Sequence, residues 1–276
     1  MRGTIGWLAL GWVAVSALAE ERAVTASLIA EQESIQPGKP FWLGVRLQMA
    51  PGWHTYWKNS GDSGLPTRVT WKLPPGFQPG PLQWPAPERL GSGPIVDYGY
   101  QKDVVLLAEI TPGPAVQAGG DALLALQVKW LECREKCLPG SADLSITLPV
   151  RAELPRRAVP SALFQETRLR LPRESPGWRL AKHRAKANVL ILRPPRGIGP
   201  AREAYFFPEE PARLEHAAPQ NVGGSGVNWW LELEQAPNAP KKLEGLRGVV
   251  AVKAPAASGE TRVLAVDARA PKEESR

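Results

Sequence analysis

The chain has 276 residues, which suits one large or two ordinary domains, and its formal net charge is only +7. The basic excess gathers between residues 151 and 196 with few interleaved aromatic residues. This pattern excludes nucleic acid as a partner and favours a solvated face, or a surface for an acidic partner or an anionic membrane. With 29 Pro and 26 Gly, short strands separated by turns are expected rather than long helices.

Residues 1–19 are typical of a secretory signal. Arg2 supplies the positive charge, residues 5–18 form the apolar region, and residues 17–19 read Ala-Leu-Ala, a small-residue cleavage site. A retained membrane anchor is the alternative, but the apolar run is short for a span of about 20 residues. The mature protein is therefore expected to begin at Glu20, to be exported and to be soluble.

Alternation of apolar and polar residues with a period of two predicts half-buried strands in the first half of the chain. The segments that show it are residues 41–47, 67–73, 104–110, 122–130 and 144–150. Clusters of Pro and Gly separate the strands at residues 36–40, 73–76 and 111–114. Short strands with regular turns predict a β-sandwich.

A Pro-rich stretch, residues 152–173, separates this region from a second set of strand signals, and a short helix is expected within it over residues 162–169. The second set comprises residues 188–192, 204–207, 229–233, 249–253 and 262–266. The predicted organisation is a signal peptide over 1–19, a first β-sandwich over 20–153, a second over 154–267 and a disordered tail over 268–276. The predicted fold class is all-β, with two sandwich domains.

Cys133 and Cys137 are the only cysteines of the chain. On one straight strand, the four steps between them would place their Cα atoms about 13 Å apart, whereas a disulfide needs a separation below about 7 Å. Pro139 and Gly140 follow directly, and a strand pattern precedes the pair. A hairpin turn is therefore favoured, with both sulfurs at the end of a sandwich and within reach of a partner.

Three interpretations of the cysteine pair are open. A structural disulfide with so small a ring would restrict the unfolded chain by only about 2 kcal/mol. A Cu(I) site would use two thiolates, but thioether partners are limited to Met1, which leaves with the signal, and Met49. A redox-active pair is the main hypothesis. It would not be a thioredoxin-type site, which needs C-x-x-C in a βαβ context.

Other polar residues are expected to be structural. His54 is either a catalytic base or metal ligand, or a packed histidine, and the aromatic residues around it favour packing. Asp62 lies in a turn sequence. His183 and His216 fall in the second domain. The sequence contains no Ser/His/Asp set, phosphate-binding loop or zinc spacing, so no cofactor and no metal are expected.

Several ordered blocks of the sequence look familiar. They are residues 51–66 (PGWHTYWKNSGDSGLP), 83–89 (QWPAPER), 98–100 (YGY) and 130–139 (WLECREKCLP). Together they resemble the N-terminal periplasmic region of the DsbD/ScsB family of thiol–disulfide reductases, with the ScsB branch closest. Residues 205–208 (YFFP) and 216–220 (HAAPQ) resemble that family's second β-domain.

The resemblance implies a periplasmic immunoglobulin-like domain whose redox pair is Cys133 and Cys137. It also implies a cap loop around Asp97, with Tyr98 or Tyr100 as the shielding ring. Implied partners are thioredoxin-like periplasmic oxidoreductases and a membrane electron-transfer protein, with the chain acting as a monomer. Cytochrome c biogenesis and copper tolerance are the processes associated with such proteins.

Two departures from the family pattern leave questions open. The cysteines are spaced more closely than in the DsbD branch, and the chain has neither a transmembrane electron channel nor a C-terminal thioredoxin domain. It is therefore expected to receive electrons from another protein, and the direction of flow stays open. The alternative function is a non-catalytic binding module with a structural disulfide, which docks a membrane partner or binds copper.

Overall fold

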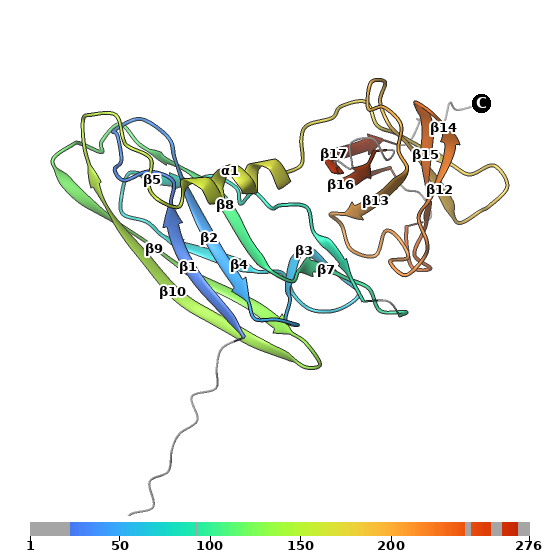
Figure 1. Ribbon diagram of the computed structural model, residues 1–276, viewed down its shortest axis with the longest axis horizontal. Coiled ribbons are helices and arrows are strands. Elements are labelled where there is room, and N and C mark those ends of the chain that lie inside the picture. Colours follow the sequence, from blue (N-terminus) through green and yellow to red (C-terminus); the bar gives the residue numbers. More distant parts are fainter. Residues whose placement is uncertain (1–22, 92, 241–243, 255–260, 270–276) are drawn as a thin grey trace, which may run out of the picture.

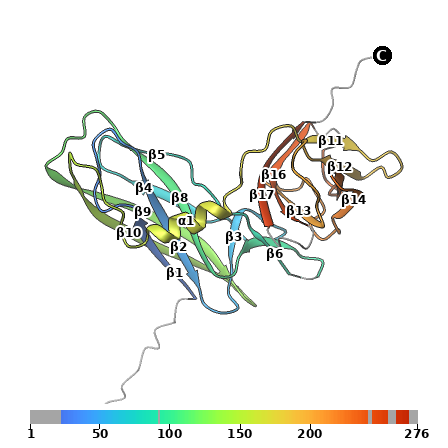
Figure 2. The same cartoon turned by 45° about the horizontal axis from the view of Figure 1, so that its top comes forward.

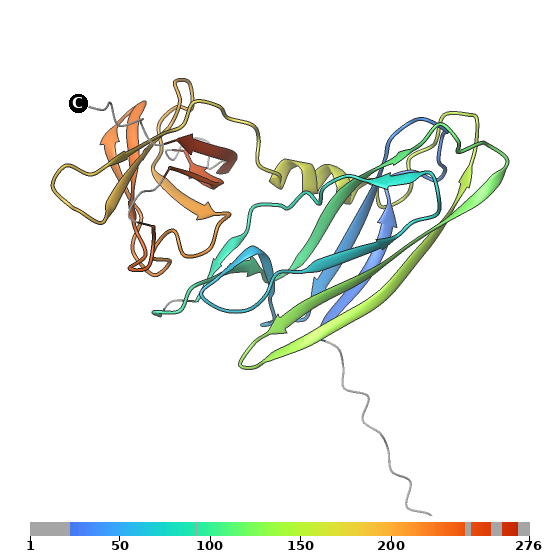
Figure 3. The same cartoon turned by 180° about the vertical axis from the view of Figure 1, so that it is seen from behind.

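The computed structural model describes residues 23–91, 93–240, 244–254 and 261–269, so the predicted signal peptide lies outside the described residues. Figure 1 shows two lobes: an elongated one built from β1 to β10 and helix α1, and a smaller one built from β11 to β17. The same two lobes are evident from other directions in Figures 2 and 3. The prediction of an all-β chain with two sandwich-like domains is confirmed.

The first domain is a sandwich of two antiparallel sheets. One sheet has the order β1 (Val24–Ala30), β2 (Phe41–Met49), β8 (Asp103–Pro112) and β5 (Phe77–Pro79). The other has the order β10 (Cys137–Val150), β9 (Gly120–Cys133) and β4 (Arg68–Lys72). Burial alternates along β9, where Leu124, Leu126, Val128 and Trp130 face the core, as the period of two predicted.

A small third sheet joins the sandwich on the side of the second domain (Figure 1). Its strands are β3 (Thr55–Gly61), β7 (Asp97–Tyr100) and β6 (Glu88–Leu90). The register between β3 and β7 shifts after Tyr56, so β3 carries a bulge or irregularity before Gly61. Bulges re-aim side chains next to functional sites, and within this stretch Asn59 donates a hydrogen bond to the Pro208 carbonyl of the second domain.

Helix α1 (Ser161–Arg170) covers the predicted 162–169 segment and packs on the first domain. Phe164 is fully buried against Val105 and Leu107 of β8. Arg168 donates two hydrogen bonds, of 2.6 and 2.7 Å, to the Glu31 carboxylate. The chain therefore passes to the second domain after this helix and not at residue 154. No helix of the described segments is long and apolar enough to cross a membrane.

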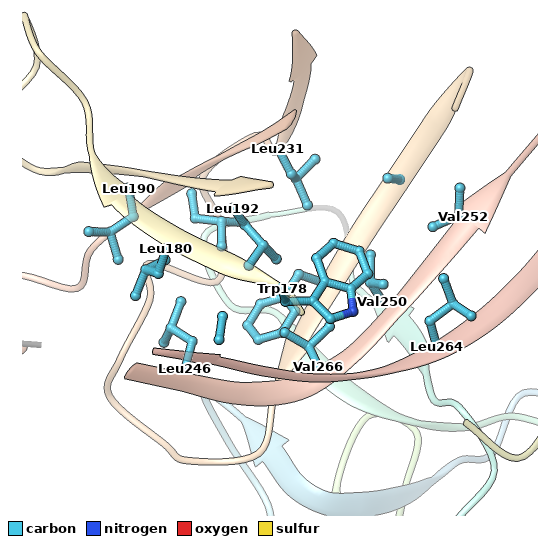
Figure 4. Packing of buried hydrophobic residues seen from close by; sticks show 14 of the residues in the cluster. Trp178, Leu180, Leu190, Leu192, Leu231, Leu246, Val250, Val252, Leu264 and Val266 are labelled. Atoms are coloured by element: carbon cyan, nitrogen blue, oxygen red, sulfur yellow. The ribbon is translucent and has the colours of Figure 1, made fainter. Parts of the chain in front are cut away.

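The second domain is one seven-stranded sheet that folds over a core. Its order is β13 (Glu203–Pro208), β16 (Gly245–Lys253), β17 (Thr261–Arg269), β11 (Arg179–Lys182), β12 (Val189–Arg193), β15 (Asn228–Glu234) and β14 (Asn221–Ser225). A single parallel pair, Arg179 with Arg269, joins β11 to β17. In Figure 4, side chains of β11, β12 and β15 and side chains of β16 and β17 surround Trp178. Because β17 runs to Arg269, residues 268 and 269 of the expected tail belong to a strand, and the rest of it lies outside the described residues.

Candidate redox site

Cys133 and Cys137 close the tip of the long β9–β10 hairpin. Cys133 ends β9, Cys137 begins β10, and the two are direct partners across a turn of residues 134–136. Their Cα atoms lie 4.2 Å apart and their sulfurs form a disulfide. The hairpin predicted from the spacing is confirmed, and its tip lies at one end of the first domain (Figure 1).

The two cysteines are not equally exposed. Cys133 is only 2% exposed, whereas Cys137 and the turn residues are exposed. The backbone N–H and C=O of Cys133 both hydrogen-bond to His54, at 3.0 Å each, which holds this cysteine at the start of β3. Of the two cysteines, Cys137 is therefore the one that the surface presents to a molecule outside the protein.

Tyr56 is the side chain that contacts both sulfurs. Its hydroxyl donates to Sγ of Cys133 at 3.0 Å and lies 3.5 Å from Sγ of Cys137. Burial raises the pKa of Tyr56, the Ser63 hydroxyl opposes this, and the Asp97 carboxylate adds to it. The phenol therefore keeps its proton at neutral pH. It can donate a hydrogen bond to a negative charge that develops on Cys133. Such a hydrogen bond is stronger than one between neutral groups because its acceptor is charged.

The loop that follows β3 covers the Tyr56 ring. Gly64 lies so close to it that a Cβ atom at this position would come within 2.2 Å of Cζ of Tyr56. The φ angle of Gly64 is +73°, a conformation that favours glycine. Ser63 is held in turn by Asp97, which accepts hydrogen bonds of 2.9 Å from its N–H and of 2.8 Å from its hydroxyl.

Two tryptophans support the hairpin tip. The Arg134 guanidinium stacks over the Trp53 ring at 5.5 Å from its centre. The Trp130 indole donates to the buried Glu132 carboxylate at 2.9 Å, and its ring covers Gly140, where a Cβ would come within 2.2 Å of it. These contacts keep the disulfide on an ordered strand end.

Comparison with known proteins agrees with this geometry. Residues 20–149 match the family model described as "Thiol:disulfide interchange protein DsbD, N-terminal". The predicted resemblance to the DsbD/ScsB family is thereby confirmed for this part of the chain. No curated protein matches the sequence.

Among solved structures, the chain is similar to the N-terminal periplasmic domain of ScsB from Proteus mirabilis. The TM-score is 0.64 at 16% identity, over 96% of this chain and 97% of that chain, so both domains share its fold. The N-terminal domain of DsbD from Neisseria meningitidis, in its reduced form, gives a TM-score of 0.27 at 15% identity, over 51% of this chain and 94% of that chain.

The predicted cap residues Asp97, Tyr98 and Tyr100 all lie on β7. Asp97 adjoins the site, because it holds Ser63. The Tyr98 ring contacts Phe207 of the second domain, at 5.2 Å between ring centres, and the Tyr100 hydroxyl donates to the Pro85 carbonyl at 2.8 Å. The contacts of these two rings are thus made away from the sulfurs, and their shielding role stays a prediction.

His54 is a packed residue, as the aromatic sequence around it predicted. Its ring meets the Tyr56 ring edge-on, with centres 5.2 Å apart, and its Nε2 is buried with no hydrogen-bond partner among the described residues. Burial lowers the pKa of His54, although the Asp97 carboxylate raises it to a lesser degree. The described residues contain no group of three or more His, Cys, Asp or Glu that could hold a metal ion.

Replacing His54 should change how stability depends on pH. Because the pKa of His54 is lowered on folding, the unfolded chain takes up a proton below about pH 6.5 that the folded chain does not. This group therefore destabilises the fold as the pH falls below that value. We expect His54→Phe to lose less stability than the wild type between pH 7 and pH 5 in urea denaturation. Parallel pH profiles of the two proteins would contradict this account.

Proposed function

We propose that this protein is a periplasmic thiol–disulfide exchange protein that passes electrons between a membrane reductase and thioredoxin-like oxidoreductases. The observation that carries the proposal is the asymmetry of the pair: one cysteine is exposed, and the other is buried and its sulfur accepts a hydrogen bond from Tyr56. A disulfide that only strengthens the fold needs neither an accessible sulfur nor a donor aimed at the other. The redox chemistry is assigned to Cys133 and Cys137.

Each half of the cycle is a balanced exchange. In the reduced protein, the Cys137 thiolate attacks a partner disulfide, forms a mixed disulfide and releases one partner thiolate. The Cys133 thiolate then attacks Sγ of Cys137 and releases the second partner thiolate, so two electrons pass to the partner and the Cys133–Cys137 bond forms. Reduction of the Cys133–Cys137 disulfide follows the reverse path. A reductant thiolate attacks Sγ of Cys137, and Cys133 leaves as a thiolate that the Tyr56 hydroxyl stabilises.

The surroundings of Cys137 suit a protein partner. The hairpin tip carries Arg134 and Lys136, and Leu138 next to the exposed cysteine is itself exposed. Transient protein interfaces commonly have an apolar centre surrounded by charged residues, and the surface beside Cys137 has this arrangement. A thioredoxin-like protein, whose disulfide lies at its surface, is the class of partner that this tip would accept.

The reduction potential of the pair tests the proposal. Wild-type protein is equilibrated with glutathione buffers of known ratio, and the free thiols are counted by alkylation and mass spectrometry. We expect a value of roughly −270 to −150 mV, within the range of exchange proteins. A value below about −300 mV would mark a structural disulfide and would favour the binding-module alternative.

A further inference from the structure

The contact between the two domains reaches the loop that covers Tyr56. Nδ1 of His216, from the second domain, lies 2.8 Å from a carboxylate oxygen of Asp62, which directly precedes Ser63. His216 is 5% exposed and its ring packs edge-on against Tyr98, with centres 5.0 Å apart. The position of this histidine is therefore fixed by the packing of both domains.

Other contacts join the same two surfaces. Asn59 donates to the Pro208 carbonyl at 2.8 Å in a buried hydrogen bond, and Trp57 and Tyr98 share a hydrophobic cluster with Phe207 and Val249. Lys58 pairs with Glu209 in a half-exposed ion pair. The second domain thus contacts the end of β3 through these residues, and it contacts the loop after β3 through Asp62.

A continuous series of contacts leads from His216 to the disulfide. The second carboxylate oxygen of Asp62 accepts from the Val96 N–H at 2.8 Å, and the Asp62 N–H donates to the Val96 carbonyl at 2.9 Å. Asp62 is therefore held between the approach to β7 and the second domain. Two residues further, Gly64 lies against the Tyr56 ring, whose hydroxyl reaches Cys133.

We infer that the second domain positions the Tyr56 hydroxyl over the disulfide, through the hydrogen bond between His216 and Asp62. This inference rests on the proposed function and adds a role for the second domain in it. His216 touches neither sulfur, so it is a positioning residue. Its effect on exchange passes through the loop of residues 61–64, which fixes the Tyr56 ring because Gly64 leaves no space between them.

A double-mutant cycle separates positioning from general stability. Four proteins are compared: wild type, His216→Ala, Tyr56→Phe and the double variant. The measured quantity is the rate at which dithiothreitol reduces the oxidised pair: its thiolate attacks Cys137, Cys133 leaves as thiolate, and closure of the dithiothreitol ring completes the two-electron transfer. We expect His216→Ala to slow reduction about threefold to tenfold in the wild-type background and not at all in the Tyr56→Phe background.

Two further variants sharpen the test. His216→Asn places an amide N–H near the position of Nδ1 and should restore most of the rate. Glu209→Gln removes the Lys58 ion pair, another domain contact that does not involve the loop, and should reduce at the wild-type rate. Should His216→Ala not fold, Asp62→Ala removes the same hydrogen bond from the first domain, together with the one from the Val96 N–H, and is expected to slow reduction at least as much.

The outcomes distinguish this inference from the proposed function. Equal slowing by His216→Ala in both backgrounds, or no rescue by His216→Asn, would overturn the positioning role while the exchange function stands. An unchanged rate in Tyr56→Phe would overturn it as well, since the contact being positioned would then have no effect. A wild-type pair that dithiothreitol cannot reduce would instead defeat the proposed function itself.

Discussion

Cys133→Ala should form a stable mixed disulfide with an oxidised thioredoxin-like protein, and Cys137→Ala should not. In the first variant, the remaining sulfur is exposed at the hairpin tip and can attack, but no second cysteine is present to resolve the intermediate. In the second, the remaining sulfur belongs to a residue that is 2% exposed. Attack by a buried thiol requires local opening of the hairpin, so the reaction is slow.

The reaction with an aromatic disulfide reagent measures the same difference without a partner. We expect the free thiol of Cys133→Ala to react at least about tenfold faster than that of Cys137→Ala, because accessibility as well as thiolate fraction sets the rate. Non-reducing electrophoresis with the oxidised partner then reports trapping. Faster trapping by Cys137→Ala would reverse the assignment of the attacking and resolving sulfurs.

Gly64→Ala should be strongly destabilising and should also displace the Tyr56 ring. The added Cβ would come within 2.2 Å of the Tyr56 ring, and the φ angle of +73° is unfavourable for alanine. The backbone conformation alone costs roughly 1–2 kcal/mol, and forcing a methyl group into a packed site adds about 1–3 kcal/mol. The Tyr56 ring must also move, so we expect the disulfide to be reduced more slowly as well.

Gly38 provides a matched control for this variant. Its φ angle is +69°, close to that of Gly64, but no atom lies within 4 Å of the position that a Cβ would occupy. Gly38→Ala should therefore lose only the backbone contribution, about 1–2 kcal/mol, and keep the wild-type rate of reduction. Urea denaturation gives both stabilities. If the two variants lost equal stability, the contact between Gly64 and Tyr56 would carry no energetic weight.

Local rules were sufficient for most of the strands and for the hairpin. The alternating segments of the first domain became β2, β4, β8, β9 and β10. Strand β3 was not predicted, because Thr55, Tyr56 and Trp57 are consecutive and all buried, which removes the period of two. A strand that lies between a sandwich and a second domain is covered on more than one side, so its sequence cannot alternate.

The candidate site was predicted only in part, because its parts lie far apart along the chain. The sequence identified Cys133 and Cys137, and strand geometry placed them in a turn. Tyr56 is 77 residues from Cys133 and reaches it only through the pairing of His54 with Cys133. The block of residues 51–66 marked the region as distinctive, but nothing local in it indicates that this tyrosine faces sulfur.

The domain boundary shows the same limit. The prolines between residues 152 and 173 predicted a separation, and one occurs, but α1 packs on the first domain because Phe164 fits against β8. The block of residues 216–220 resembled the family, but nothing local in it indicates that His216 contacts the first domain. Its contact with Asp62 joins residues 154 positions apart, and long-range contacts of this kind are set by the arrangement of domains.

The way in which Cys133 is anchored bears on what happens when the disulfide opens. Both of its backbone hydrogen bonds run to His54 and not to the strand that carries Cys137, so they do not depend on the sulfur–sulfur bond. The ring that the disulfide closes is also small, so opening the disulfide increases the conformational entropy of the chain only slightly. The cysteine pair can therefore be reduced and oxidised repeatedly while the fold stays the same. The structural change is confined to the few residues of the hairpin turn.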